Sequence, residues 1–340
     1  MRQANSFYPF QRSMTAMDLN TTRLPPSVVV TRPVSASETS KSTTRMEMEK
    51  PVWETYERES KFGEWIRVDK VVRYVFIRQN ADGGYSFAQG GDSSVEDTYY
   101  GVRILGMLGV KPLNKDRTVA FLKRMQHGDG SYDSVKVAYY AVKTLKELGS
   151  KPERDVKKFV YSMRRRDGGY GSREVDVETS SELETTYIAL KLLKLLEAPL
   201  KPTTTKFILS LKNPDGSFGH RGYSRLASTY HALACLKLLE FNGKFEDTLR
   251  WILGCENPKG GFARSPEVHD PYFVVDDLYY AVKALEILGE PARYPVQHLR
   301  LIGKFQNRNG GFRRSIFIGI STFESTYYAL SSLKTLLTWM

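Results

Sequence analysis

Two adjacent carboxylic acids, Asp276 and Asp277, are the residues whose type and spacing most suggest chemistry. Each carboxylate raises the pKa of its neighbour, so such a pair suits a proton donor or a cation-binding site. Two acids at the start of a helix also commonly cap it or complement its dipole. His269 and Asp270 lie shortly before the pair in a long loop, and functional residues concentrate on loops held by a rigid scaffold. We therefore predict Asp276 and Asp277 as catalytic residues and His269 as a ligand-binding residue.

Asp276 belongs to a set of residues that stand three positions before a tyrosine in long apolar segments. The six tyrosines are Tyr99, Tyr139, Tyr187, Tyr230, Tyr279 and Tyr327. The residues three positions earlier are Glu96, Lys136, Glu184, Ala227, Asp276 and Glu324. Tyrosine offers an apolar face to a hydrocarbon chain and a hydroxyl to a polar head, but a tyrosine shared by all copies also suits packing between repeats. We predict Tyr230, Tyr279 and Tyr327 as ligand-binding residues.

Other residues with metal-binding or anion-binding character favour a structural role. His231 and Cys235 are four residues apart, but no third ligand lies nearby, so we interpret them as core packing. The only cysteines are Cys235 and Cys255, which excludes a disulfide framework and a four-cysteine zinc site. The basic run 164–166 is most simply a solvated helix end.

A short turn motif recurs six times and organises the chain from Trp53 onward. The copies are Asp82–Tyr85, Asp129–Tyr132, Asp167–Tyr170, Asp215–Phe218, Lys259–Phe262 and Asn309–Phe312. The second residue is glycine in every copy, as a tight turn with positive φ requires. The aromatic fourth residue is expected to pack into the core and hold the turn in place.

Each turn lies between two segments whose apolar residues recur at helical spacing, such as 71–77 before the first turn and 99–108 after it. The second segments often end at glycine, as at Gly109, Gly149 and Gly289, with proline shortly afterwards. This pattern predicts a helix, a turn and a helix, six times over, and hence twelve helices.

The ends of the repeat array favour a closed ring. An open array needs terminal repeats with a polar outer face, yet the last segment, 327–337, is as apolar as the internal ones. We therefore predict an all-α fold, an α6/α6 barrel of six helix–turn–helix repeats. The second helices lie inside, the first helices lie outside, and residues 51–340 form a single domain.

Residues 1–50 differ from the rest of the chain. They are rich in serine and threonine and poor in apolar residues, and prolines 25 and 26 interrupt any helix. Met46 and Met48 stand just before the repeats. The composition favours a disordered tail or a start site assigned too early over an organelle transit peptide.

The overall composition excludes some classes of protein. The formal net charge is +12, but the basic residues are spread and no recognition-helix or finger motif occurs, so we expect no specific nucleic-acid partner. No apolar run reaches the roughly 18 residues that a membrane-spanning helix needs. We expect a cytoplasmic protein without a membrane span.

The repeats resemble those of a known family. The pattern Gln-x-x-Asp-Gly-Gly-aromatic, as in 79–85, resembles the repeat of protein prenyltransferase β subunits and of triterpene cyclases such as squalene–hopene cyclase. The glutamine is present in three copies (Gln79, Gln126, Gln306) and replaced in three (Arg164, Lys212, Glu256). The resemblance covers about residues 65–340 and implies an α/α barrel whose aromatic-lined funnel holds an isoprenoid chain. Because the motif is structural in that family, it specifies the fold more than the activity.

The resemblance also implies a metal site, which this sequence retains only in part. Protein prenyltransferases hold zinc with an Asp-x-Cys pair and a histidine; here Asp276 matches, but Leu278 and Ser325 occupy the other two positions. A catalytic zinc normally takes three protein ligands. We therefore expect no zinc and no zinc-dependent thioether formation, while magnesium stays open as a cofactor. Arg264 is the best remaining candidate for binding a diphosphate.

Several functions stay open. Class II terpene cyclases use Asp-x-Asp-Asp, of which residues 274–277 keep the last two acids. The main hypothesis is a barrel that binds an isoprenoid or its diphosphate, a prenyl transferase or a cyclase if active. The alternatives are a non-catalytic barrel that binds a partner protein or lipid, and an α/α-barrel carbohydrate-active enzyme. The latter needs paired carboxylates facing one cleft.

Overall fold

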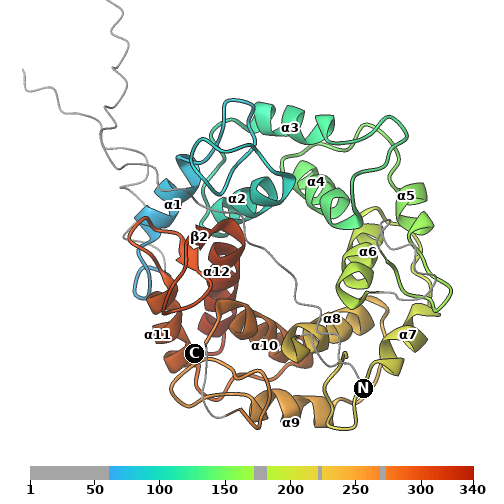
Figure 1. Cartoon of the computed structure of the whole chain (residues 1–340), viewed down its shortest axis with the longest axis vertical. Coiled ribbons are helices and arrows are strands. Elements are labelled where there is room, and N and C mark those ends of the chain that lie inside the picture. Colours follow the sequence, from blue (N-terminus) through green and yellow to red (C-terminus); the bar gives the residue numbers. More distant parts are fainter. Residues whose placement is uncertain (1–60, 172–181, 221–223, 269–272) are drawn as a thin grey trace, which may run out of the picture. The chain divides into compact units, whose positions relative to one another are not determined.

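The computed structural model describes residues 61–171, 182–220, 224–268 and 273–340. The segment 1–50, His269 and Asp270 lie outside these residues. The described part contains twelve helices and one short hairpin (Figure 1). The outer helices are α1 (Val68–Phe76), α3 (Lys115–Arg124), α5 (Lys157–Ser162), α7 (Thr204–Ser210), α9 (Glu246–Gly254) and α11 (Pro295–Phe305). The inner helices are α2 (Val95–Met107), α4 (Val135–Glu147), α6 (Leu183–Leu195), α8 (Arg225–Leu238), α10 (Val275–Leu288) and α12 (Phe323–Leu337).

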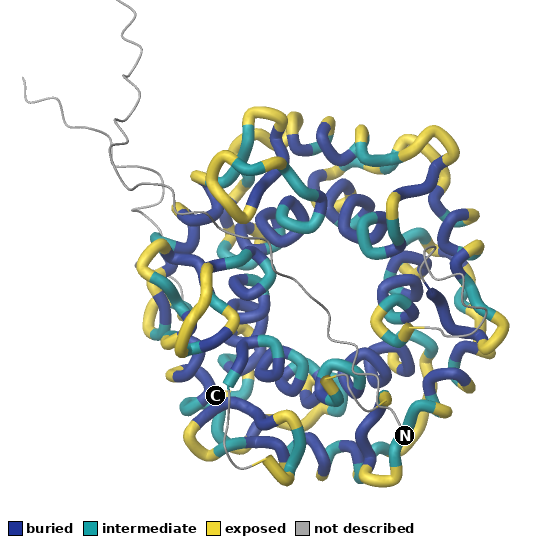
Figure 2. The backbone as a smooth tube through the Cα atoms, in the orientation of Figure 1, coloured by how far each residue is buried: buried dark blue, intermediate teal, exposed yellow. Residues whose placement is uncertain are grey.

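The helices form two concentric rings, as the repeats predict. The second helix of each repeat lies in the inner ring and the first helix lies outside it (Figure 1). Buried residues occupy the layer between the two rings and much of the inner helices, whereas the exposed residues lie mainly on the connecting loops (Figure 2). The predicted α6/α6 barrel is confirmed. No helix of the described residues is long and apolar enough to cross a membrane.

The glycine turns join neighbouring repeats. In the first turn, Gly83 has φ of 89°, and an added Cβ atom would lie 2.3 Å from the backbone of Arg117 at the start of the next outer helix. The Thr118 hydroxyl on that helix donates to the Gly83 carbonyl at 2.7 Å. The aromatic residue that ends the motif is almost fully buried in all six copies, as predicted. Each turn therefore holds its own repeat against the following one.

The same contact closes the ring between the last repeat and the first. The Gln306 side chain accepts a hydrogen bond from the Arg67 backbone N–H at 2.9 Å and donates to the Arg67 carbonyl at 3.1 Å. An added Cβ atom at Gly310 would lie 2.0 Å from the carbonyl oxygen of Lys70. Helix α12 packs on α2 as the other inner helices pack on their neighbours. The chain is thus a closed ring and not an open array.

The fifth repeat replaces the usual contact with a buried acid and a histidine. Glu256 stands where three other repeats have glutamine, and its Oε1 accepts hydrogen bonds from the Tyr294 backbone N–H at 2.9 Å and from His298 Nε2 at 3.0 Å. Because His298 Nδ1 accepts from the Gly261 N–H at 2.8 Å, the ring donates through Nε2. The second carboxylate oxygen of Glu256 is buried and has no hydrogen-bond partner among the residues that the structure describes.

A two-stranded hairpin precedes the last inner helix. Strand β1 (Phe312–Arg313) pairs with β2 (Ser321–Thr322) in antiparallel register, Phe312 opposite Thr322. Of the residues between the strands, Ser315 is buried, whereas three are among the most exposed apolar residues of the described chain.

Candidate functional site

Two layers of mostly aromatic side chains fill the centre of the ring. The first layer consists of the six tyrosines that align between the repeats, and the next residue of each inner helix contributes to the second. The second layer is Tyr100, Tyr140, Ile188, His231, Tyr280 and Tyr328. The space between these side chains is about 50 Å³, enough for one or two water molecules. The two mouths of the ring are therefore separated by packed side chains, and no isoprenoid chain fits between the layers as they stand.

Ring stacking and hydroxyl hydrogen bonds stabilise the two layers. Tyr279 and Tyr328 stack with their centroids 4.2 Å apart and 12° between the planes. The hydroxyl oxygens of Tyr187 and Tyr230 lie 2.8 Å apart. Burial raises the pKa of these hydroxyls well above the ordinary value, so they stay neutral hydrogen-bonding groups at physiological pH.

His231 and Cys235 lie in this packed centre and not in a metal site. The His231 ring contacts Tyr187, Tyr230 and Tyr280, and burial lowers its pKa to about 3. Cys235 is fully buried one turn further along α8, and burial raises the pKa of its thiol. Both side chains are therefore uncharged at neutral pH, in keeping with the core packing expected from the sequence.

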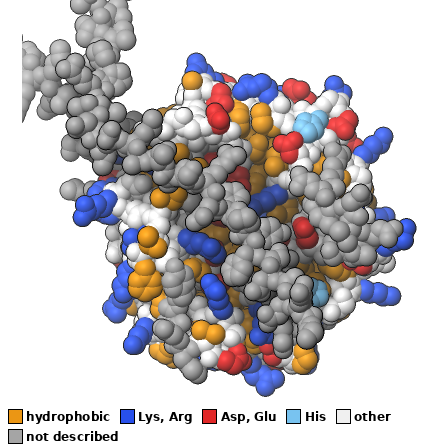
Figure 3. Space-filling model, in the orientation of Figure 1, with side chains coloured by type: hydrophobic (Ala, Val, Ile, Leu, Met, Phe, Trp, Pro, Cys, Tyr) orange, Lys and Arg blue, Asp and Glu red, His pale blue; other side chains and the backbone are white. Residues whose placement is uncertain are grey.

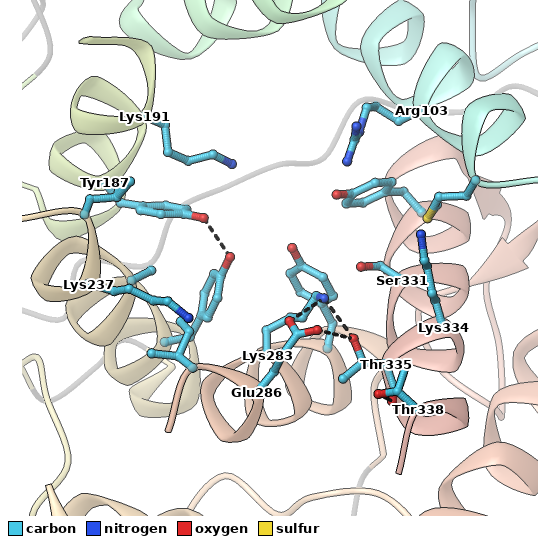
Figure 4. Close-up of a pocket in the computed structure, with 17 residues that line it drawn as sticks. Arg103, Tyr187, Lys191, Lys237, Lys283, Glu286, Ser331, Lys334, Thr335 and Thr338 are labelled. Atoms are coloured by element: carbon cyan, nitrogen blue, oxygen red, sulfur yellow. Dashed lines mark hydrogen bonds and ion pairs between the residues drawn. The ribbon is translucent and has the colours of Figure 1, made fainter. Parts of the chain in front are cut away.

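At the end of the ring where the inner helices finish, a cavity of about 590 Å³ opens (Figure 4). Tyrosines 187, 230, 279 and 327 of the first layer line it, together with apolar side chains such as Met107, Leu238 and Ile287. The basic side chains that line it are Arg103, Lys191, Lys237, Lys283 and Lys334. Glu286 is the single acidic residue among the described residues that line it. We call this cavity the basic chamber.

Lys191 carries the least compensated charge in the basic chamber. Its Nζ atom lies 4.5 Å from the centre of the Tyr139 ring and 4.8 Å from that of Tyr187, and its side chain points into the chamber (Figure 4). No hydrogen bond or ion pair joins Nζ to any residue in the described ranges. Burial, with the charges of Arg103 and Lys143, lowers the pKa of Lys191 to about 7. An anion beside Nζ would therefore favour its protonated form.

The other cations of the chamber are partly paired. Arg103 Nη1 lies 2.5 Å and Lys143 Nζ 3.1 Å from the same carboxylate oxygen of Glu147. Lys283 Nζ lies 2.7 Å from Glu286 Oε2 (Figure 4). Two glutamates thus pair with Arg103 and Lys283 of the chamber and with Lys143, which does not line it. Lys191 and the two exposed lysines, Lys237 and Lys334, remain. The chamber keeps an excess of positive charge over a partly apolar lining, which suits an anion with a hydrocarbon part.

The opposite mouth, where the inner helices begin, is acidic. Lys136 Nζ lies 3.2 Å from Glu96 and 3.8 Å from Glu184, so one lysine bridges two acids. Glu324 Oε1 accepts hydrogen bonds from the hydroxyls of Tyr328 at 2.9 Å and Tyr100 at 3.2 Å. Glu96, Glu184 and Glu324, which stand three positions before aligned tyrosines, therefore lie at one mouth. Each is engaged by a neighbouring side chain.

Asp276 and Asp277 belong to this acidic mouth but have different surroundings. Asp276 Oδ2 accepts a 2.6 Å hydrogen bond from Arg314 Nε, and burial nevertheless raises its pKa above the ordinary value. Asp277 is buried and accepts a 3.3 Å hydrogen bond from the Ser224 hydroxyl. Burial, reinforced by the charge of Asp276 and opposed by Arg264, raises the pKa of Asp277 to about 6. Asp277 is thus a carboxyl group that is partly protonated near neutral pH.

The parallel inner helices explain the opposite signs of the two mouths. Each helix has a partial positive charge at its N-terminus and a partial negative charge at its C-terminus, and all six point the same way along the ring axis. Acids at the beginning and bases at the end complement these dipoles. Dipoles account for the sign of the charge at each mouth, but not for a half-buried lysine that has no counter-ion in the described segments.

A sequence model of the prenyltransferase alpha-alpha toroid domain matches residues 57–138, 132–271 and 275–339, nearly the whole repeat region. The chain belongs to this family. A comparison with curated protein sequences gives no match.

Solved structures of related toroids confirm the fold. One is Candida albicans protein geranylgeranyltransferase-I complexed with GGPP, 20% identical over 78% of this chain and 90% of that one, with a TM-score of 0.60. Another is the type II terpene cyclase MstE from Scytonema in complex with geranylgeranyl dihydroxybenzoate, 11% identical over 80% and 97% of the two chains, with a TM-score of 0.60. A protein from Actinoplanes is 16% identical over 84% and 99%, with a TM-score of 0.59. At these identities the likeness shows the shared fold.

In this toroid the predicted site residues divide between the two mouths. Tyr230, Tyr279 and Tyr327 line the basic chamber. Asp276 and Asp277 lie at the acidic mouth, and the charge of Arg264 acts on Asp277 there. His269 lies outside the described residues. The predicted ligand-binding tyrosines and the predicted catalytic acids are thus separated by the central aromatic layers.

The residues of this toroid do not fit the three-ligand zinc site that the resemblance implies. Leu278, at the cysteine position, is fully buried and has only a hydrocarbon side chain. Ser325, at the histidine position, is buried, and its backbone N–H donates to the Thr322 side chain that caps α12. Among the residues with described positions, no group of three or more His, Cys, Asp or Glu could hold a metal ion. No zinc-dependent step is therefore assigned to this chain.

The basic chamber was not predicted from the sequence. Its signal is periodic: Arg103, Lys191 and Lys283 each follow an aligned tyrosine by four residues, about one helical turn. The site was predicted instead among the acids that stand three positions before the same tyrosines, and these lie at the acidic mouth.

Proposed function

We propose that this toroid binds an isoprenoid diphosphate in the basic chamber, without zinc. The observation that carries the proposal is the half-buried Lys191, which has no counter-ion among the described residues and opens into a cavity with both aromatic and cationic lining. Keeping a half-buried amine protonated without a partner is costly, and a bound anion would offset that cost. The diphosphate would lie among Lys191, Arg103 and Lys283, because these are the least exposed cations of the chamber.

The lining of the chamber supports an amphiphilic ligand over a purely polar one. Tyrosine faces and the side chains of Met107, Leu238 and Ile287 offer contact to a hydrocarbon chain. The hydrocarbon chain of the ligand has to stay within the chamber or leave through its open mouth, because the tyrosine layers fill the centre of the ring. The related structures hold GGPP and geranylgeranyl dihydroxybenzoate, two ligands that share a geranylgeranyl chain, the first of them a diphosphate.

A second candidate function is proton donation at the acidic mouth, as in type II terpene cyclases. The buried carboxyl of Asp277 favours it, since a pKa of about 6 leaves part of the population protonated at neutral pH. This site would act on a ligand that enters from the acidic mouth. The two candidates therefore predict different sensitive residues.

The test is a calorimetric titration with geranyl, farnesyl and geranylgeranyl diphosphate, with and without magnesium. Farnesol and inorganic diphosphate serve as probes of the two halves of the ligand. We expect binding of a prenyl diphosphate that weakens in Lys191→Gln and persists in Asp276→Asn and Asp277→Asn. Lys194→Gln is the matched control, because Lys194 lies on the same helix, pairs with Glu240 and does not line the chamber.

Each outcome decides between the candidates. Binding that is lost in the aspartate variants and kept in Lys191→Gln would move the site to the acidic mouth. The absence of binding by all three prenyl diphosphates would refute the proposal and favour a barrel that binds a protein or another lipid.

A further inference from the structure

The β1–β2 hairpin exposes three large apolar side chains within four residues. Phe317 is 68% exposed, Ile318 76% and Ile320 68%. The only other described apolar residue of this size as exposed is Met340, at the end of the chain. Single exposed apolar residues are ordinary on soluble proteins, but a cluster marks a surface that contacts something apolar.

Hydrogen bonds and an ion pair join the base of the hairpin to helix α10. The Val275 backbone N–H donates to the Arg314 carbonyl at 2.9 Å, and Arg314 also pairs with Asp276 at 2.6 Å. Arg313 Nη2 donates a hydrogen bond to the Ile316 carbonyl at 2.7 Å, and this bond stabilises the turn of the hairpin. The apolar tip, formed by Phe317, Ile318 and Ile320, is therefore attached to a base that is hydrogen-bonded to the toroid.

Basic residues adjoin the exposed tip. A shallow depression beside it is lined by Ile320 and by Phe87, which is 46% exposed, together with Arg78, Arg308 and Arg313. No acidic residue of the described ranges lines this depression. In Figure 3, hydrophobic side chains are visible over the part of the molecule where Figure 1 shows the hairpin, with Lys and Arg side chains near them.

We infer that this hairpin docks the toroid on an anionic membrane surface. Apolar side chains that project from a fixed turn can enter the boundary between headgroups and acyl chains, while neighbouring arginines contact anionic headgroups. A protruding tip of three side chains is small for a stable protein interface, which buries about 800 Å² on each partner. It is sufficient for reversible binding to a bilayer, where each inserted side chain adds affinity.

The test measures binding of the full chain to vesicles of phosphatidylcholine alone and of phosphatidylcholine with phosphatidylserine. We expect co-sedimentation with the anionic vesicles that decreases as salt is raised. Phe317→Ser and Ile318→Ser should each weaken this binding roughly 10-fold, and Arg308→Glu should weaken it only for the anionic vesicles. Leu113→Ser is the matched control, because Leu113 is 58% exposed outside the hairpin.

A second measurement does not depend on loss of binding. In Ile318→Trp, the fluorescence of the added tryptophan should shift to shorter wavelength with anionic vesicles and be quenched by brominated lipid chains. An unshifted and unquenched spectrum would overturn the inference, as would equal vesicle binding by wild type, Phe317→Ser and Ile318→Ser. Self-association without lipid that Ile318→Ser abolishes would also overturn it, in favour of a contact between copies of the chain.

Discussion

Replacing Lys191 by glutamine removes the half-buried cationic group of the basic chamber that has no counter-ion within the described part of the chain. Glutamine keeps a polar side chain of similar length, so we expect the fold to be retained. A hydrogen bond from a charged donor contributes about 1.5–3 kcal/mol, and a loss of about 2 kcal/mol corresponds to roughly 30-fold weaker binding of a prenyl diphosphate.

Because the pKa of Lys191 is depressed, ligand binding should be accompanied by proton uptake at this residue. A residue with only a structural role would show no such uptake. With a pKa of about 7, Lys191 is mostly neutral at pH 7.5 in the free protein, whereas an anionic ligand stabilises its charged form. Binding at pH 7.5 should therefore take up about 0.7 proton through this group. The affinity should be highest below pH 7 and fall as the pH rises above 7.

Calorimetry in two buffers of different ionisation enthalpy measures this proton uptake directly. The difference between wild type and Lys191→Gln isolates the lysine from any proton that the ligand itself exchanges. Lys194→Gln should behave as wild type in both affinity and uptake. Equal proton uptake by wild type and Lys191→Gln would refute the reasoning, because it would mean that the ligand does not change the protonation of Lys191.

Four further predictions test other parts of the structure. Asp277→Asn should raise the free energy of unfolding by about 2 kcal/mol at pH 8 and much less at pH 4, because a raised carboxyl pKa costs stability only once the group ionises; a gain independent of pH would contradict this. Glu256→Gln should stabilise the fold by about 1 kcal/mol in urea unfolding, because the amide can donate to the turn carbonyl four residues on, as in three other repeats; a loss would show that the carboxylate is needed. Gly310→Ala should destabilise the ring far more than Gly289→Ala. Both glycines have positive φ, but only at Gly310 would the added Cβ atom collide with a backbone atom, the Lys70 carbonyl oxygen. Equal shifts of the thermal transition in the two variants would argue against the closing contact. Elemental analysis of the purified protein should find no stoichiometric zinc, and about one tightly bound zinc per chain would restore the metal-dependent reading.

The ring could be predicted from the sequence because its determinants are local and repeated. Glycine at the second turn position, the aromatic residue that follows and the helical spacing on either side each recur six times. Closure followed from the apolar last helix, and the contact between Gln306 and Arg67 is its physical basis. The turn glycine, the aromatic residue and the helical spacing depend on residues that are close together in the sequence, so they can be predicted from it.

The packed centre and the free charge of Lys191 could not be predicted in the same way. Whether the tyrosines leave a funnel depends on how side chains from six helices meet at the axis, which no single repeat determines. Among the described residues Lys191 has no ion-pair partner, whereas Arg103 and Lys143 share Glu147. That outcome depends on three helices and becomes visible only when they are assembled.

Closure of the ring constrains how a protein of this kind can change. An open repeat protein can gain or lose a unit at its ends, since each repeat contacts only its neighbours. In this chain the sixth turn must reach the first outer helix, so inserting or deleting a whole repeat would alter the curvature and separate Gln306 from Arg67. Evolution at constant repeat number is then restricted to substitutions within repeats and to the lengths of the loops between them. The fifth repeat shows such a substitution, where an acid and a histidine replace the common contact without loss of the turn.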